Sequence, residues 1–161
     1  MLNFLIIAAS AFSQTLTCSD IKNGVFISFS KTDGSKTIYT RSGDVQKEFN
    51  ASTRENVLWD LEWINDCSYY LEYNSGLEDQ PKKELQMLKK HKILVQITSV
   101  SNDYYVFQSY LDKESNPIIL KDTLWIKQQR DAKNRLINNP RIDSVIAVQK
   151  AAYKSSLART A

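Results

Sequence analysis

Three carboxylates lie close together in one stretch of the sequence, and paired carboxylates are the groups that hydrolyse glycosidic bonds. Asp60, Glu62 and Glu72 fall in two adjacent segments in which apolar and polar residues alternate. If these segments pair as antiparallel strands, the three side chains lie near one another on one face. Such positions more often form a solvated face with Lys or Arg opposite. We therefore predict no catalytic residue here and no enzymatic activity.

The other residue types that commonly carry out chemistry are scarce. The one histidine, His91, lies in a lysine-rich stretch, where a solvated surface position is expected. The two cysteines are better paired with each other, so no ligand set remains for a transition metal. The four glycines form no phosphate-binding cluster. We expect neither a metal nor a cofactor.

The start of the chain indicates export. Met1 to Phe12 is apolar apart from Asn3 and Ser10, and is too short for a transmembrane helix of about 20 residues. Ala11-Phe12-Ser13 offers the small-x-small pattern that a signal peptidase cleaves. We predict a signal peptide over 1–13, a mature chain without a transmembrane segment, and a periplasmic or secreted location. The alternative is a buried N-terminal strand, because no Lys or Arg precedes the apolar run.

Export gives the two cysteines a role. An even number of cysteines in an oxidising compartment favours pairing, so Cys18 and Cys67 are expected to form a disulfide. The chain-entropy model values such a loop of about 50 residues at roughly 4 kcal/mol. Two separate buried thiols are the alternative if the protein is cytosolic.

Short runs rich in Val, Ile, Tyr, Phe, Trp and Thr alternate with turn residues through the middle of the chain, a pattern typical of antiparallel all-β domains. We predict eight strands, at Gly24–Ser30, Lys36–Arg41, Asp44–Asn50, Arg54–Ile64, Cys67–Asn74, Lys92–Val100, Tyr104–Leu111 and Pro117–Lys127. Eight short strands protect their edges best by closing into an eight-stranded, lipocalin-like barrel or by folding into a two-sheet sandwich. We expect the barrel.

Aromatic residues are concentrated in the central strands. Side chains alternate across a strand, so Val57, Trp59, Leu61 and Trp63 share one face, which we predict to be the core face. A barrel lined by Trp59, Trp63, Tyr69 and Tyr104 would hold an apolar ligand. Eight-stranded barrels are narrow, however, so the rings more often fill the interior and leave no cavity.

Two segments interrupt the β pattern. Pro81–His91 is expected to be a short helix or a loop, because Leu85, Met87 and Leu88 lie among lysines. In the last part of the chain, apolar residues recur at helical spacing after Asn139 and Pro140, which predicts an amphipathic helix. We therefore divide the chain into a signal peptide (1–13), a disulfide-closed β domain (14–128) and a C-terminal helical extension (129–161).

The segment from Trp59 to Tyr73 resembles the central hairpin of a group of small Bacteroidetes envelope proteins of unassigned function. Arg41 with Gln46 and Glu48 is similar to another mark of that group, and the resemblance covers about residues 18 to 127. It implies export, a Cys18–Cys67 pair and a compact β domain, but no active site. Proteins of this group are often mislabelled as topoisomerase IV, a function that the length of this chain contradicts.

These observations favour a binding or structural protein. Our leading interpretation is a non-enzymatic envelope or secreted β domain that binds a small apolar ligand or a protein partner. The alternative is a structural component of an envelope assembly, with a packed core and a docking C-terminal helix. A net charge of +3 is too small to indicate nucleic-acid binding, and we predict none.

Overall fold

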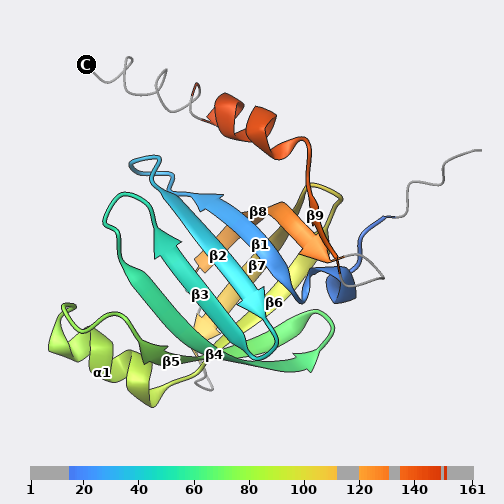
Figure 1. Ribbon diagram of the computed structural model, residues 1–161. Helices are drawn as coiled ribbons and strands as arrows, with labels where there is room; N and C mark the ends of the chain where they lie inside the picture. The colour runs from blue at the N-terminus through green and yellow to red at the C-terminus, as the bar shows by residue number, and fades with distance from the viewer. Residues whose placement is uncertain (1–14, 112–119, 131–134, 150, 152–161) are drawn as a thin grey trace, which may run out of the picture.

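The protein forms a closed antiparallel β-barrel. The computed structural model describes residues 15–111, 120–130, 135–149 and 151. Each strand pairs with the next one along the chain, and β1 also pairs with β8, which closes the barrel (Figure 1). The strands are β1 (Gly24–Phe29), β2 (Lys36–Ser42), β3 (Val45–Asn50), β4 (Asn56–Asn65), β5 (Ser68–Ser75), β6 (Ile93–Val100), β7 (Tyr104–Leu111), β8 (Leu120–Arg130) and β9 (Leu136–Asn138).

The eight predicted strands are all present, with bounds that differ by a few residues, and the barrel prediction is confirmed. A ninth strand, β9, was not predicted. It lies in the segment expected to be a helical extension, and it pairs with the last residues of β8, from Gln128 to Arg130. The sheet therefore continues past residue 128, where we had placed the end of the β domain.

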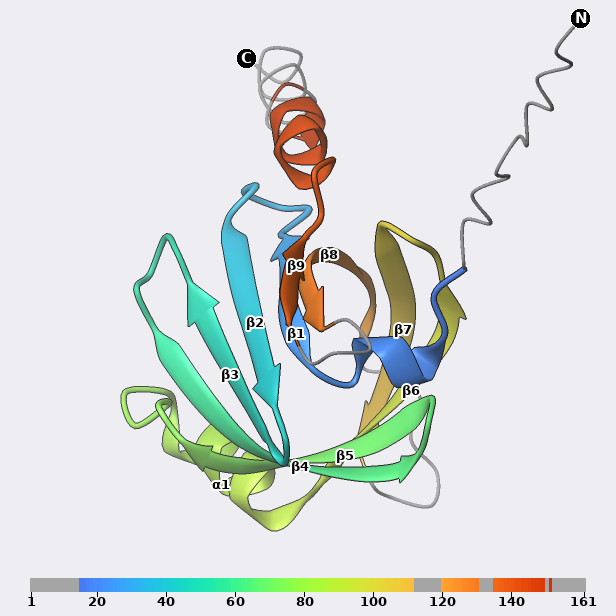
Figure 2. The same ribbon diagram turned by 45° about the vertical axis from the view of Figure 1, so that its right-hand side comes forward.

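Each end of the barrel carries a helical element. A 3-10 helix, η1 (Cys18–Ile21), places the fully buried Ile21 in the core, and the Cys18–Cys67 disulfide joins η1 to the β4–β5 turn. Figure 2 shows η1 beside the β4–β5 hairpin. The connection at the other end contains the helix α1 (Lys82–Lys90), whose Leu85 and Leu88 pack against the core. Of the two structures expected for this segment, a short helix or a loop, the helix is confirmed. We call the η1 side the closed end and the other side the far end.

Strand alternation builds the core as predicted. Trp59 and Leu61 of β4 are buried with residues at matching positions of the other strands. The buried inward-facing residues include Phe26, Trp59, Leu61, Tyr69, Leu71, Tyr73, Val95, Ile97, Tyr105, Phe107, Leu124 and Ile126. These side chains come from β1 and from β4 to β8, while the buried residues of β2 and β3 are the polar Arg41 and Gln46.

The C-terminal part leaves the barrel after β9. A helix over residues 142–149 begins with the buried Ile142 and then runs outside the barrel wall, where Val148 is 66% exposed (Figure 1). The rest of the predicted amphipathic helix, and the predicted signal peptide, lie largely outside the described residues.

No helix in the described parts of the chain is long and apolar enough to cross a membrane.

Replacing both cysteines, as Cys18→Ser with Cys67→Ser, is expected to lower the free energy of unfolding by about 2–4 kcal/mol. The bridge ties η1 to a residue 49 positions away, so its loss frees a long loop in the unfolded chain. Urea denaturation followed by circular dichroism measures the change. Reductant should destabilise the wild-type protein by a similar amount and leave the double variant unaffected; equal stability of both proteins without reductant would contradict the prediction.

Candidate functional site in the barrel interior

The most unusual residue of the interior is a buried arginine. Arg41 of β2 is only 2% exposed, and its guanidinium lies near the closed end of the barrel. Nε donates to Gln46 Oε1 at 2.8 Å, Nη1 donates to the Ile21 carbonyl of η1 at 3.2 Å, and Nη2 donates to the Tyr105 hydroxyl. A charge buried this deeply is tolerated only when acceptors surround it.

Aromatic rings enclose the same guanidinium. Its Cζ lies 4.7 Å from the ring centroid of Phe26, 4.9 Å from that of Tyr69 and 5.3 Å from that of Tyr105. Ring faces attract a cation that has lost its water, so they offset part of the cost of burying it. Burial opposes the charge on Arg41, but its surroundings, with Tyr105 first, outweigh burial and raise its pKa further. Arg41 is therefore always charged.

Gln46 connects Arg41 to Glu48 through two hydrogen bonds. An arginine can only donate hydrogen bonds, so Gln46 must turn its carbonyl oxygen towards Arg41. The amide nitrogen of Gln46 then faces the other way and donates to Glu48 Oε1 at 2.7 Å. The three residues form one directed chain of hydrogen bonds, which we call the Arg41–Gln46–Glu48 relay. It fixes one oxygen of Glu48 as an acceptor.

Glu48 is an ionisable group that titrates near neutrality. Burial raises its pKa to about 7, against the opposing effects of the Gln46 hydrogen bond and the Arg41 charge. The indole N–H of Trp59 also favours the ionised form, although Nε1 completes no hydrogen bond with a described residue. Glu48 still keeps some accessible surface, because it is half-buried. It is both chemically responsive and reachable by solvent.

Exposure inside the barrel increases from the closed end to the far end. Phe26, Tyr69 and Tyr105 around Arg41 are almost completely buried. Ser28, Tyr73 and Ser109 nearer the far end are also buried, but the other inward-facing residues there are half-buried: Tyr39, Glu48, Val57, Ile93, Leu111 and Asp122. Inward-facing side chains with accessible surface are therefore more frequent toward the far end, where Leu85 and Leu88 of α1 also pack against the core.

The half-buried residues include several polar groups. The Tyr39 hydroxyl hydrogen-bonds with the Ser28 hydroxyl across 3.2 Å. Burial, with the nearby carboxylates of Glu48 and Asp122, raises the pKa of Tyr39. This half of the interior thus combines two carboxylates and two hydroxyls with the edge-to-face pair of Trp59 and Tyr73, whose centroids lie 5.9 Å apart.

The structure brings three of the four predicted ligand-lining residues together and separates the fourth. Trp59 lies beside Glu48, while Trp63 and Tyr69 stack at 4.7 Å next to Arg41. Tyr104 instead packs on Trp125 at 5.1 Å on the outer surface of the barrel, since its neighbour Tyr105 points inward. Placing Tyr104 in the interior was wrong by one position in the alternation of β7.

The carboxylates considered for catalysis lie on the outer wall. Asp60 is opposite Glu72 in the β4–β5 pair, and both are exposed. Lys92 Nζ lies 3.3 Å from Glu62 Oε2 and 3.3 Å from Glu72 Oε2, which confirms the expected solvated face with a lysine opposite. Such exposed pairs contribute little to stability.

In the sequence, Arg41, Gln46 and Glu48 stand out only as part of the resemblance to the envelope proteins, and no function is predicted for them. Arg41, Gln46 and Glu48 occupy alternate positions that face the core, where apolar residues are usual. That run of polar residues at inward positions of a hairpin was the signal. Nothing in the sequence located their partners, since Tyr105 and Ile21 are far away in the chain.

Among the described residues, no group of three or more His, Cys, Asp or Glu side chains is arranged to hold a metal ion.

No protein-family model, curated protein or solved structure matches this chain.

Replacing Arg41 by Met should lower the free energy of unfolding by about 2–4 kcal/mol, because three acceptors lose their donor inside the barrel. Chemical denaturation measures the loss. Lys47→Met, on the exposed face of the neighbouring strand, is the matched control and should change stability by less than about 0.5 kcal/mol. Equal stability of the two variants would contradict the role of Arg41.

Replacing Glu48 by Gln should change how stability depends on pH. The folded-state pKa of about 7 lies above the ordinary value of 4.5, so the folded protein holds this proton more tightly than the unfolded chain. The stabilising contribution is complete below about pH 4.5 and is lost as pH rises to about 7. Wild-type stability should thus fall relative to Glu48→Gln by roughly 2–3 kcal/mol across this window.

Melting temperatures from pH 4 to 9 test this expectation, with Glu72→Gln on the outer wall as control. The control should follow the wild-type curve. Parallel curves for wild type and Glu48→Gln would show that Glu48 titrates as an ordinary surface carboxylate.

Proposed function

We propose that this protein is a non-enzymatic binding protein of the cell envelope or the secreted fraction, which holds a small amphipathic molecule inside its barrel. The disulfide supports an oxidising compartment. The rise in exposure from the closed end to the far end supports entry of a ligand there. The observation that carries the proposal is the Arg41–Gln46–Glu48 relay, which presents a carboxylate next to the aromatic and aliphatic side chains of the core.

The relay favours a particular head group. Glu48 has one oxygen committed to Gln46, and Asp122 adds a second carboxylate on the same side of the interior. A cationic or hydrogen-bond-donating head group complements this arrangement, and a carboxylate head group is repelled. Arg41 does not offset this repulsion, because its guanidinium is buried and donates to three protein acceptors. The ligand we expect is an apolar chain or ring system that bears an amine or hydroxyl.

Three probes of equal chain length test the head group: dodecylamine, dodecanol and dodecanoate. Quenching of tryptophan fluorescence reports binding, since Trp59 lies next to Glu48. We expect the amine to bind at least about ten-fold more tightly than the carboxylate at pH 8, a difference of about 1.4 kcal/mol. Amine affinity should increase as pH rises through about 7, because Glu48 becomes ionised.

Two tryptophan variants show where the probe binds. Trp59→Phe should lose most of the fluorescence response, while Trp125→Phe, on the outer wall, should keep it. Glu48→Gln should remove the preference for the amine and the pH dependence. Preference for dodecanoate would contradict the head-group assignment, and no response to any probe would mean that the side chains fill the barrel.

The second candidate function is a structural role in an envelope assembly, and the helix over 142–149 favours it. This helix lies outside the barrel with an exposed Val148, and only Ile142 at its start is buried. Ending the chain after Ile142 should leave the barrel folded and its probe binding unchanged. If that truncation also removes the protein from envelope complexes isolated by native gel electrophoresis, the helix is an attachment element.

A further inference from the structure

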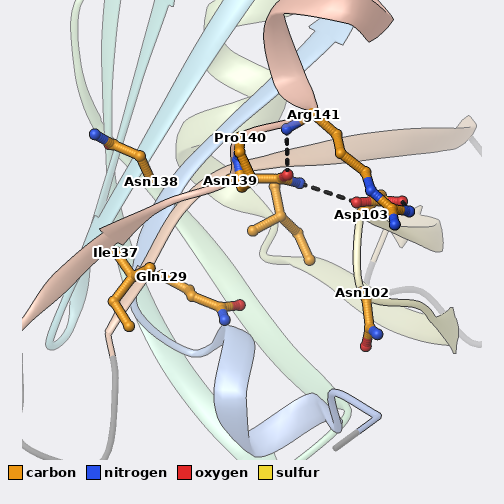
Figure 3. A pocket seen from close by; sticks show the side chains of 9 residues that line it. Asn102, Asp103, Gln129, Ile137, Asn138, Asn139, Pro140 and Arg141 are labelled. Atoms are coloured by element: carbon orange, nitrogen blue, oxygen red, sulfur yellow. Dashed lines mark hydrogen bonds and ion pairs between the residues drawn. The ribbon is translucent and has the colours of Figure 1, made fainter. Parts of the chain in front are cut away.

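A polar pocket lies outside the barrel, near its closed end. It is enclosed by the β6–β7 turn, the last residues of β8, strand β9 and the residues that lead into the helix over 142–149 (Figure 3). Its volume is about 270 Å³, slightly below the range of about 300–1,000 Å³ typical of small-molecule sites. The residues that line it are Asn102, Asp103, Ile126, Gln129, Ile137, Asn138, Asn139, Pro140 and Arg141.

The charged groups of the pocket neutralise each other. Asp103 Oδ2 lies 3.3 Å from Arg141 Nη1, and Asp103 Oδ1 accepts a hydrogen bond from Asn139 Nδ2 at 3.2 Å. Asn139 Oδ1 in turn accepts from the Arg141 backbone N–H at 2.9 Å. These contacts hold the loop in place and leave no net charge among the lining residues. A neutral ligand suits this wall better than an anion or a cation does.

Side-chain amides supply most of the polar surface. An amide both donates and accepts, and the pocket has four, from Asn102, Gln129, Asn138 and Asn139. Gln129 Oε1 is buried, and no described residue donates a hydrogen bond to it. Figure 3 shows this carboxamide pointing into the space between Asn102, Asp103 and Asn139. A buried acceptor without a donor is unfavourable, and a ligand hydroxyl that met this oxygen after a small rotation of the carboxamide would relieve that cost.

The remaining wall is aliphatic. Ile137 and Pro140 supply exposed apolar surface next to the amides, and the buried Ile126 lies behind them. A pyranose ring has both surfaces in one small molecule, since its rim carries hydroxyls and its faces carry C–H groups. A peptide is a weaker match, because peptides are usually recognised through a strand edge by backbone groups, whereas side-chain amides line this pocket.

We propose that this pocket is a second binding site, separate from the barrel interior, and that it takes a single neutral sugar residue, either free or at the end of a glycan. Gln129 accepts from a ring hydroxyl, the Asn side chains bind neighbouring hydroxyls, and the aliphatic wall contacts one face of the ring. In the envelope or secreted fraction, where we place the protein, such a site would attach it to surface polysaccharide while the barrel carries its own ligand.

The test is a titration of the full chain with the methyl glycosides of glucose, galactose, mannose and N-acetylglucosamine, followed by two-dimensional NMR of the side-chain amides. We expect at least one glycoside to shift the resonances of Gln129 and Asn139 with a millimolar Kd. Gln129→Leu should weaken that binding at least five-fold. This variant removes the buried acceptor, so its melting temperature should be unchanged or higher.

Gln96→Leu, at an exposed position on β6, is the matched control and should bind the sugar as the wild type does. The proposal is supported if a glycoside shifts the Asn139 side-chain amide resonance in the wild type and in Gln96→Leu, but not in Gln129→Leu. It is overturned if no glycoside shifts these resonances, or if Gln129→Leu binds as tightly as the wild type. Shifts caused by an acetylated, amidated tripeptide but by no sugar would also overturn it and identify a peptide site.

Discussion

The positive charge of Arg41 is the constraint on which the closed end of the barrel depends. A buried guanidinium needs several acceptors at fixed positions, and these come from elements far apart in the chain: Gln46 of β3, Tyr105 of β7 and the Ile21 carbonyl of η1. The rings around it can enclose the cation only if the barrel is closed there. The 3-10 helix η1, the disulfide that holds it and the aromatic rings therefore act together to stabilise a charge without water.

The same charge gives the interior a direction. Because Arg41 only donates, the orientation of the Gln46 amide is fixed, and with it the role of Glu48 as an acceptor. The contacts of Arg41 at the closed end thus determine the orientation of Gln46 and of the Glu48 carboxylate, which lies nearer the far end and keeps some accessible surface. This division separates the almost fully buried part of the interior around Arg41 from the part in which we propose that a ligand binds.

Much of the fold was predictable because a strand has a side-chain period of two, and turn residues separate the apolar runs. The choice between barrel and sandwich depended on the β1–β8 pairing, which no local pattern encodes. Tyr104 and Tyr105 are chemically identical, so only the parity of β7 decides which one faces inward. The alternation places Arg41 on the inward face, but its burial depends on partners that only the fold supplies, such as Tyr105 and the Ile21 carbonyl. The three residues of β9 were too few to show a pattern.

The β1–β8 pairing also determines when the barrel can form. Gly24 pairs with Gln129, so the two strands that close the barrel, β1 and β8, can pair only after all the strands between them have been synthesised. Until then, two unpaired sheet edges stay open to association with other chains. Contacts this distant in sequence slow folding, so these edges stay exposed for longer before the barrel closes.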